Sequence, residues 1–456
     1  MPVQSLGQSI PPGGVTAQQP VQPTGTQTPA DVQAIIESLT PIQARFRQQS
    51  SFLRIALPQA SFTTPGLGVD VPANISNVGL AIRLITEWNI VLQVVNTATS
   101  AQTFQVSKLF PWNLIASTVI QINGGAAIYA ASGPADYSVM TRQRRGSRKL
   151  TTAQSGWAAA FGLSVDPALL QVNTLGSNLT ATNGSALTPS MSGIISISMA
   201  GSSVAGATSQ WTLRFITIER VVQDRDSLLG VPPLQNNATF VQVTRRLVGA
   251  LAGTRNDFSM PFYTAGANLT ASMITATADT TYEFASVPSD PTLYAALVSN
   301  SFQTQEQRGF VVSSTGAEAM NYPIPTNCYL IALHNILTDT NGAGLPAFDS
   351  TNGLGLLKLV YAGASVIPVR DFPYRERAMA YLDYDFDPLT MPFTRIWDGE
   401  RTSDDIVSSD NMGWLDCYAT ASPTELIDVG TSASTALTAN ITREVVITGN
   451  VQQLGG

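Results

Sequence analysis

The sequence predicts an all-β protein made of two similar halves. Residues 84–96 alternate apolar and polar side chains in a stretch rich in Val, Ile and Trp, the pattern of a half-buried strand. A stretch of similar length and apolarity recurs at residues 327–337. Tight turns are expected at Asn123-Gly124 and Asn341-Gly342, because such turns need positive φ angles and Asn and Gly adopt them readily. Two units of this kind predict two eight-stranded jelly rolls in tandem, with short helical insertions and an N-terminal arm prone to disorder.

The arm is expected to span residues 1–55, followed by a first jelly roll at 56–290 and a second at 291–456. Residues 1–30 are rich in Pro, Gln, Gly and Thr and contain no basic residue, so they bury too little apolar surface to order themselves. After Thr28-Pro29, a plausible cap and first-turn proline, an apolar stripe at helical spacing predicts an amphipathic helix: Val32, Ile35, Ile36, Leu39, Ile42 and Phe46. Its end is basic: Arg45, Arg47 and Arg54. This helix either docks on its own domain or a neighbour, or lies near an acidic lipid surface.

In the first half, polar turns separate the remaining strands. Strands are expected at residues 61–71, 74–78, 104–110, 117–123, 126–130, 193–199, 211–219, 239–248 and 282–287. Residues 150–190 are expected to form a long loop region with a short helix near 157–161. A helical turn is expected at 224–230, closed by Gly230 and stopped by prolines.

The second half begins after a crossover, which is expected at residues 288–326 because they are rich in Pro, Ser and Gln. Residues 374–383 combine good helix formers and predict a helix. Further strands are expected at residues 354–360, 364–369, 393–397, 412–419 and 443–448.

The composition favours self-association over nucleic-acid binding. Charged residues make up 12% of the chain, about half the usual share, so the surface is polar but carries little charge repulsion. The net charge of −7 argues against a dedicated nucleic-acid-binding protein. We expect no membrane-spanning helix and no secretory leader. Cys328 and Cys417 are too few for a disulfide scaffold and are expected to be buried thiols.

No catalytic, cofactor-binding or metal site is predicted, and the chain is not expected to be an enzyme. The single histidine, His334, lies in a strand-like run and is expected to be structural, because metal-binding jelly rolls need several histidines. The sequence contains neither a nucleophile elbow for a catalytic triad nor a phosphate-binding loop. The dense basic run at residues 142–149 is expected to be an exposed loop or to pair with an acidic neighbour.

Two acidic clusters leave alternatives open. The first could hold calcium, but Pro388 stands where a calcium loop needs Gly, so a solvated connection is the favoured interpretation: Asp383, Asp385 and Asp387. The second could supply the two carboxylates of a glycosidase, although no motif marks such a pair: Asp404, Asp405 and Asp410.

Several patches, in a shared order, resemble the major capsid proteins of tectivirus-like viruses. The likeness includes Pro111-Trp-Asn-Leu-Ile115 between strands, with Ser132-Gly133 after the next turn. Three further patches follow the same order: residues 77–79, 215–234 and 422–430. The longer arm, the longer 150–190 region and an extra strand after Gly430 depart from that pattern.

The resemblance implies a homotrimer of double jelly rolls that forms a pseudo-hexameric capsomer of an icosahedral virion, as in some bacteriophages. It implies neighbouring capsomers, minor capsid and penton proteins as partners, and an internal membrane around a double-stranded DNA genome. Arg45, Arg47 and Arg54 would then face the lattice or the membrane.

Two rival functions remain open on the sequence alone. The first is a glycan-binding β-sandwich, in which surface aromatic residues would stack on sugars, although core packing is the favoured interpretation for each of them: Trp397, Trp414 and Tyr418. The second is a carbohydrate-active enzyme that uses Asp404 or Asp405.

Overall fold

The structure, a computed structural model, describes most of the expected strands. Two units are distinguished along the chain, residues 1–48 and residues 49–456, and each is described by itself. Apart from Phe46, the predicted amphipathic helix, with Arg45 and Arg47, lies outside the described residues. The described residues are 46, 49–62, 70–76, 79–107, 110–143, 169–175, 179–181, 194–199, 201, 207–222, 240–253, 261–264, 268–298, 300–312, 315–338, 354–361, 366–371, 394–398, 415–418, 423–429 and 437–448.

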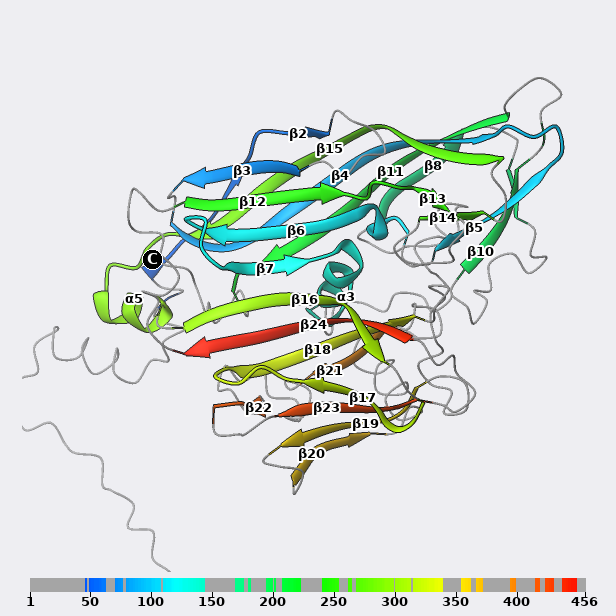
Figure 1. Ribbon diagram of the computed structural model, residues 1–456. Coiled ribbons are helices and arrows are strands. Elements are labelled where there is room, and N and C mark those ends of the chain that lie inside the picture. The colour runs from blue at the N-terminus through cyan, green and yellow to red at the C-terminus, as the bar shows by residue number, and fades with distance from the viewer. Residues whose placement is uncertain are drawn as a thin grey trace, which may run out of the picture. The chain divides into compact units, whose positions relative to one another are not determined.

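A six-stranded antiparallel sheet forms one wall of the first half, which we call the first barrel (Figure 1). Its order is β1-β15-β4-β11-β8, and β2 also pairs with β15. β4 and β15, of 17 residues each, pair from Leu80 opposite Ala285 to Asn96 opposite Leu269. The strands are β1 (Phe52–Ala56), β2 (Ala60–Phe62), β4 (Leu80–Asn96), β8 (Leu169–Leu175), β11 (Ala207–Arg220) and β15 (Leu269–Ala285).

A five-stranded sheet contributes to the same barrel. Its order is β13-β14-β5-β10-β9, with a parallel pair between β13 and β14. The strands are β5 (Gln102–Ser107), β9 (Leu179–Ala181), β10 (Ile194–Met199), β13 (Ala252–Gly253) and β14 (Phe262–Thr264).

A nine-stranded sheet runs through both halves of the chain. Its order is β21-β18-β24-β16-β7-β6-β12-β3, and β22 also pairs with β18. The strands from the first barrel are β3 (Asp70–Ser76), β6 (Ile115–Ile122), β7 (Ala127–Ala131) and β12 (Phe240–Leu247). The strands from the second half, the second barrel, are β16 (Asn300–Val312), β18 (Tyr329–Thr338), β21 (Thr394–Asp398), β22 (Leu415–Asp416) and β24 (Leu437–Thr448).

A four-stranded antiparallel sheet completes the second barrel. Its order is β17-β23-β19-β20. One buried apolar cluster joins residues of this sheet, such as Met320 and Ile427, to residues of the nine-stranded sheet, such as Leu333 and Ile441. The strands are β17 (Gly316–Pro323), β19 (Leu354–Tyr361), β20 (Val366–Asp371) and β23 (Thr424–Val429).

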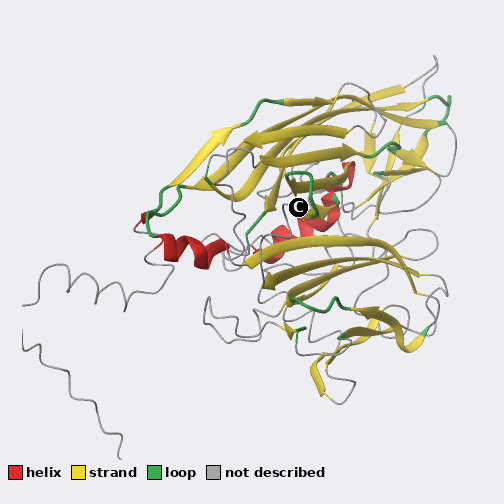
Figure 2. Cartoon of the chain, turned by 60° about the vertical axis from the view of Figure 1, so that its left-hand side comes forward, coloured by secondary structure: helices red, strands yellow, loops and turns green. Residues whose placement is uncertain are grey.

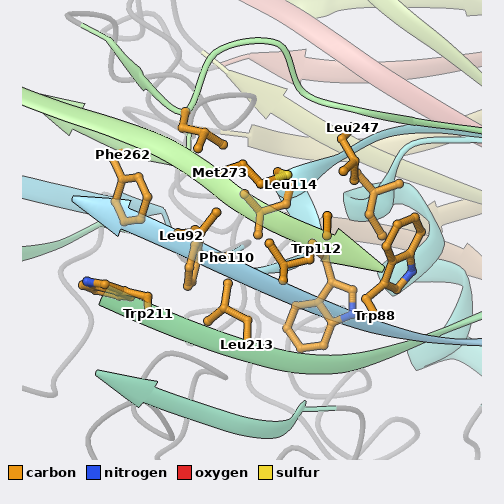
Figure 3. Close-up of a cluster of buried hydrophobic side chains, with 14 of the residues drawn as sticks. Trp88, Leu92, Phe110, Trp112, Leu114, Trp211, Leu213, Leu247, Phe262 and Met273 are labelled. Carbon is orange, nitrogen blue, oxygen red and sulfur yellow. The ribbon is translucent and has the colours of Figure 1, made fainter. Parts of the chain in front are cut away.

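The core of the first barrel is rich in aromatic side chains (Figure 3). Trp88, Trp112 and Trp211 are each at most 1% exposed. Trp112 and Trp88 both pack against Phe215, and Trp211 makes edge contacts with Phe110. The strict alternation of buried and half-buried residues along β4 explains why its sequence alternates in character.

Besides the helical residues Phe46 and Gln49, the described part of the chain contains three short helices: η1 (Trp112–Leu114), α3 (Gly133–Gln143) and α5 (Pro291–Val298). α3 follows β7 and contacts η1, β6, β7 and β11 of the first barrel and β18 of the second. Figure 2 shows it between strands of the two barrels. None of the helices in this part of the chain is long and apolar enough to cross a membrane.

The structure confirms the all-β class and several individual elements. The Asn123-Gly124 turn joins β6 to β7 with φ angles of 51° and 70°, and Gly125 donates to the Ile122 carbonyl at 2.9 Å. Positive φ at both central residues identifies the expected hairpin turn. Asn341-Gly342 and the helices expected at 157–161, 224–230 and 374–383 lie outside the described residues.

Two expectations about irregular regions were wrong. The region 150–190 contains β8 and β9, and β8 is the edge strand that pairs with β11. The supposed crossover at 288–326 contains α5, β16 and β17, and β16 pairs with β24 along its length. Because polar side chains of β16 contact the first barrel, that strand lacks the apolar alternation by which strands are recognised.

Candidate functional site: the inter-barrel seam

Buried polar side chains gather where the two barrels meet. β7 and β16 pair in parallel there, with Tyr129 opposite Thr304 and Ala130 opposite Gln305. Beside this pair, α3 and its N-cap face β16, β18 and β24. We call the following residues the inter-barrel seam: Ser132, Ser138, Arg142, Glu306, His334 and Glu444.

The N-terminus of α3 is held by a carboxylate from the second barrel. Ser132 is the N-cap, and its Oγ accepts a hydrogen bond from the Ala135 amide at 3.3 Å. The Ser132 amide and hydroxyl donate to Glu306 at 2.6 and 2.9 Å, respectively. Arg308 donates to the same carboxylate at 3.1 Å. A carboxylate at this end of a helix also interacts favourably with the helix dipole.

The first residue of α3 lies very close to the backbone of η1. A Cβ atom placed on Gly133 would lie 1.8 Å from the Trp112 carbonyl oxygen. The Trp112 ring also packs against that of Tyr137 of α3, with ring centroids 4.0 Å apart and the planes tilted by 35°. The helix can therefore approach η1 only because residue 133 has no side chain.

The C-terminal turns of α3 bind two strands of the second barrel. Arg142 donates through Nε and Nη2 to the two carboxylate oxygens of Glu444, at 2.7 and 2.5 Å. His334 Nε2 lies 2.7 Å from Glu444 Oε1, and its Nδ1 lies 2.9 Å from Ser138 Oγ. Ser138 and Arg142 are four residues apart, so they share one face of α3 and meet these partners together.

The opposite charges of Arg142 and Glu444 are buried and paired with each other. Arg142, His334 and Glu444 are 2%, 1% and 0% exposed. Burial alone would raise the pKa of the Glu444 carboxyl, but the Arg142 guanidinium and the His334 side chain outweigh it and hold that pKa well below its usual range. A buried pair with two hydrogen bonds in fork geometry fixes both position and angle of its partners.

A second buried cluster lies next to α3 within the first barrel. The Tyr129 hydroxyl donates to Asp136 of α3. Burial raises the pKa of the Asp136 carboxyl well above its usual range, and the Glu219 carboxylate raises it further. Arg245 lies 3.7 Å from Glu219. The Thr86 hydroxyl links the two residues, because it accepts a hydrogen bond from Arg245 and donates one to Glu219. The raised pKa favours protonated Asp136, which leaves one carboxylate facing one guanidinium.

The structure locates three residues that the sequence marked. His334 is buried and hydrogen-bonded on both nitrogens, as expected for a structural residue. Arg142 pairs with an acidic neighbour, which was one of the two expectations for the basic run; residues 144–149 lie outside the described residues. Arg54 belongs to β1, and its Nε lies 2.8 Å from the Glu283 carboxylate. Arg83 forms a second ion pair with the same carboxylate, at 3.3 Å.

The other marked residues are only partly described. Cys328 and Cys417 are free and buried, as expected. Tyr418 is 37% exposed and its ring contacts that of Tyr329. Among the described residues, no group of three potential metal ligands is found. Trp397 lies in β21, and the following lie outside the described residues: Trp414, Asp383, Asp385, Asp387, Asp404, Asp405 and Asp410.

Sequence reasoning missed α3 and therefore the seam. The local signal was present, because Ser132 precedes Gly133-Pro134 and Asp136, a cap followed by a first-turn proline and an acidic residue. The long-range partners left no such signal, since Arg142 and Glu444 are 302 residues apart. Chemically, a closed seam of this kind fixes the orientation of two barrels.

Comparison with solved structures supports the same architecture over nearly the whole chain. The crystal structure of the STIV major capsid protein superposes with a TM-score of 0.53 at 12% identity, covering 89% of this chain and 99% of that one. A chain from the atomic structure of Sulfolobus Turreted Icosahedral Virus gives a TM-score of 0.50 at 12% identity, covering 87% and 91%.

The chain has the double jelly-roll fold. The predicted fold class is thus confirmed. The first of these two solved chains is a major capsid protein, and the second comes from the structure of an icosahedral virus. No family model matches the sequence, and no curated protein matches it. In this double jelly roll, the β7–β16 pair and the inter-barrel seam join the two barrels.

Proposed function

We propose that this chain is the major capsid protein of an icosahedral virus. Three copies form a pseudo-hexameric capsomer, and capsomers tile a shell around an internal membrane and a double-stranded DNA genome. The observation that carries the proposal is the two-barrel superposition, which spans 99% of the STIV major capsid protein.

The seam supports this role on physical grounds. A trimer of two-barrel subunits presents six barrels, and it approximates a hexagon only if the two barrels of each subunit keep a fixed angle. A buried, forked ion pair and a capped helix resist rotation between the barrels better than apolar contacts, which are not directional. The 12% charged content of the chain favours close tiling of copies.

We assign residues 1–55 to an arm that contacts the lattice or the membrane. β1, at the end of this segment, exposes Leu53 and Ile55 at 47% and 40%. The Arg54 side chain, 58% exposed and paired with Glu283, projects from the other face of the same strand. Arg45 and Arg47 precede it in the sequence. Basic residues beside exposed apolar ones favour an anionic lipid surface.

Negative-stain imaging of the purified chain tests the capsomer. The expected particle has a hexagonal outline with three-fold symmetry. Isolated two-lobed particles at concentrations well above those of shell assembly would contradict the proposal.

Vesicle flotation tests the arm separately. The full chain should float with vesicles that contain anionic lipid and much less with zwitterionic ones. Replacing Arg45, Arg47 and Arg54 by Gln should reduce flotation, whereas the same change at the exposed Arg246 of β12 should not. Equal loss in both variants would refute the assignment of the arm while leaving the capsomer untouched.

A further inference from the structure

The two cysteines of the chain face each other in the second barrel. β18 and β22 are antiparallel, with Tyr329 opposite Asp416 and Leu330 opposite Leu415. One more step along this register sets Cys328 opposite Cys417, and the Cys417 amide donates to the Cys328 carbonyl at 3.0 Å. Side chains of directly opposite residues lie on the same face of a sheet.

Both thiols lie in one apolar cluster and interact with each other. Cys328 and Cys417 are 2% and 0% exposed and belong to the core of the second barrel. The Cys328 thiol donates to the Pro325 carbonyl at 3.3 Å, and the Cys417 thiol donates to the Leu415 carbonyl at 3.6 Å. Interaction between the two neighbouring side chains lowers the pKa of the Cys328 thiol and raises the pKa of the Cys417 thiol. Opposed residues in antiparallel strands have Cα atoms about 4.5–5.5 Å apart, within the range of about 4.4–6.8 Å that a disulfide needs.

We propose that Cys328 and Cys417 form a redox pair, which closes to an intramolecular disulfide when it meets a disulfide oxidant. The bond would join the residue before β18 to the residue after β22. It would close a loop of about 90 residues, and the stabilisation from a cross-link increases with the length of the loop that it closes. No other cysteine of the chain can compete for either sulfur.

The exchange proceeds in two steps. The Cys328 thiolate attacks one sulfur of the oxidant, forming a mixed disulfide and releasing one thiolate. The Cys417 sulfur, after losing its proton to solvent, then attacks the Cys328 sulfur and displaces the second thiolate. Two protein thiols are oxidised and one oxidant disulfide is reduced to two thiols.

The oxidant reaches the pair by local opening. β22 has only two residues, and Asn327 and Tyr418, the immediate neighbours of the cysteines, are exposed. Short strands at the margin of a sheet open at far lower free energy than the whole domain unfolds.

The test uses the full chain and oxidised glutathione as the oxidant. Native protein is equilibrated with oxidised glutathione, denatured and alkylated, and its intact mass is then measured by mass spectrometry. The closed pair takes up no alkylating group and is about 2 Da lighter than the reduced chain. Peptide mapping should join Cys328 to Cys417, and the oxidised protein should unfold several degrees higher than the reduced one, an effect that dithiothreitol reverses.

Single variants provide the matched controls. Cys328→Ala and Cys417→Ala should each take up one alkylating group or one glutathione, and dithiothreitol should not change their unfolding temperature once the glutathione is gone. The mapping of the wild-type chain stands even if a variant folds poorly. Two free thiols after full equilibration, a disulfide between chains, or a lower unfolding temperature on oxidation would each overturn the proposal.

Discussion

Replacing Glu444 by Gln should destabilise the chain far more than the same change at the surface. In Glu444→Gln, the Arg142 guanidinium remains buried without a counter-ion, and an amide NH2 or oxygen replaces a carboxylate oxygen that lies 2.5 Å from its Nη2. Breaking a buried pair by removing one partner costs about 3–5 kcal/mol. His334 loses its charged partner as well.

The control is Glu318→Gln, which removes the same charge from a half-exposed pair. Glu318 is 51% exposed and lies 2.8 Å from Lys358. Exposed pairs contribute about 0–1 kcal/mol, so this variant should resemble the wild type. Adding Arg142→Met to Glu444→Gln removes the stranded cation and should restore part of the lost stability.

Urea unfolding measures the difference. Trp88, Trp112 and Trp211 are buried in the first barrel, whereas Trp397 lies in β21 of the second and Trp414 precedes β22. Both variants are therefore made in a chain with Trp397→Phe and Trp414→Phe, in which fluorescence reports the first barrel, while circular dichroism reports both barrels. A seam that couples the barrels predicts that Glu444→Gln, in the second barrel, shifts the tryptophan signal too. If Glu444→Gln shifted the midpoint no more than Glu318→Gln, the seam would not be the stabilising contact described here.

The remaining predictions concern acid, α3 and the arm. The pKa of Glu444 is lower in the folded than in the unfolded chain, so its contribution to the free energy of unfolding is complete above the unfolded pKa of about 4.3 and is lost as the pH falls below that value. In urea titrations, the difference in free energy of unfolding between wild type and Glu444→Gln should therefore narrow towards pH 2. Gly133→Ala should lower the unfolding temperature sharply, because its Cβ would meet a backbone oxygen, whereas Gly124→Ala, in open space at φ 70°, should cost only about 1–2 kcal/mol; equal effects would argue against the close approach of α3. Ser132→Ala removes the N-cap and should cost about 1 kcal/mol in the same assay, and no change would mean that the cap is dispensable. Removing residues 1–48, which leaves β1 paired with β15, should preserve trimers but reduce closed shells in electron micrographs; loss of the trimers would assign the arm a different role.

Strands with strict alternation could be predicted from the sequence because one face of each is buried. β4 and β11 alternate along their length, and both were recognised within a few residues of their ends. The Asn123-Gly124 turn could be predicted because it depends on two adjacent residues only.

The junction of the barrels could not be predicted, because its residues follow no local rule. β16 carries Gln305, which donates to the Ala127 carbonyl and accepts from Arg443, and Glu306, which binds the cap of α3. These polar residues made the strand resemble a crossover. His334 was correctly placed as structural, but its partners Ser138 and Glu444 lie 196 and 110 residues away, beyond any periodicity.

The mass of the purified full-length chain in solution tests the central claim most directly. Light scattering after size exclusion should give three chains of 48.3 kDa, about 145 kDa, with no dependence on dilution through the micromolar range. A stable species of 48.3 kDa under the same conditions would contradict a capsomer built from three double jelly rolls.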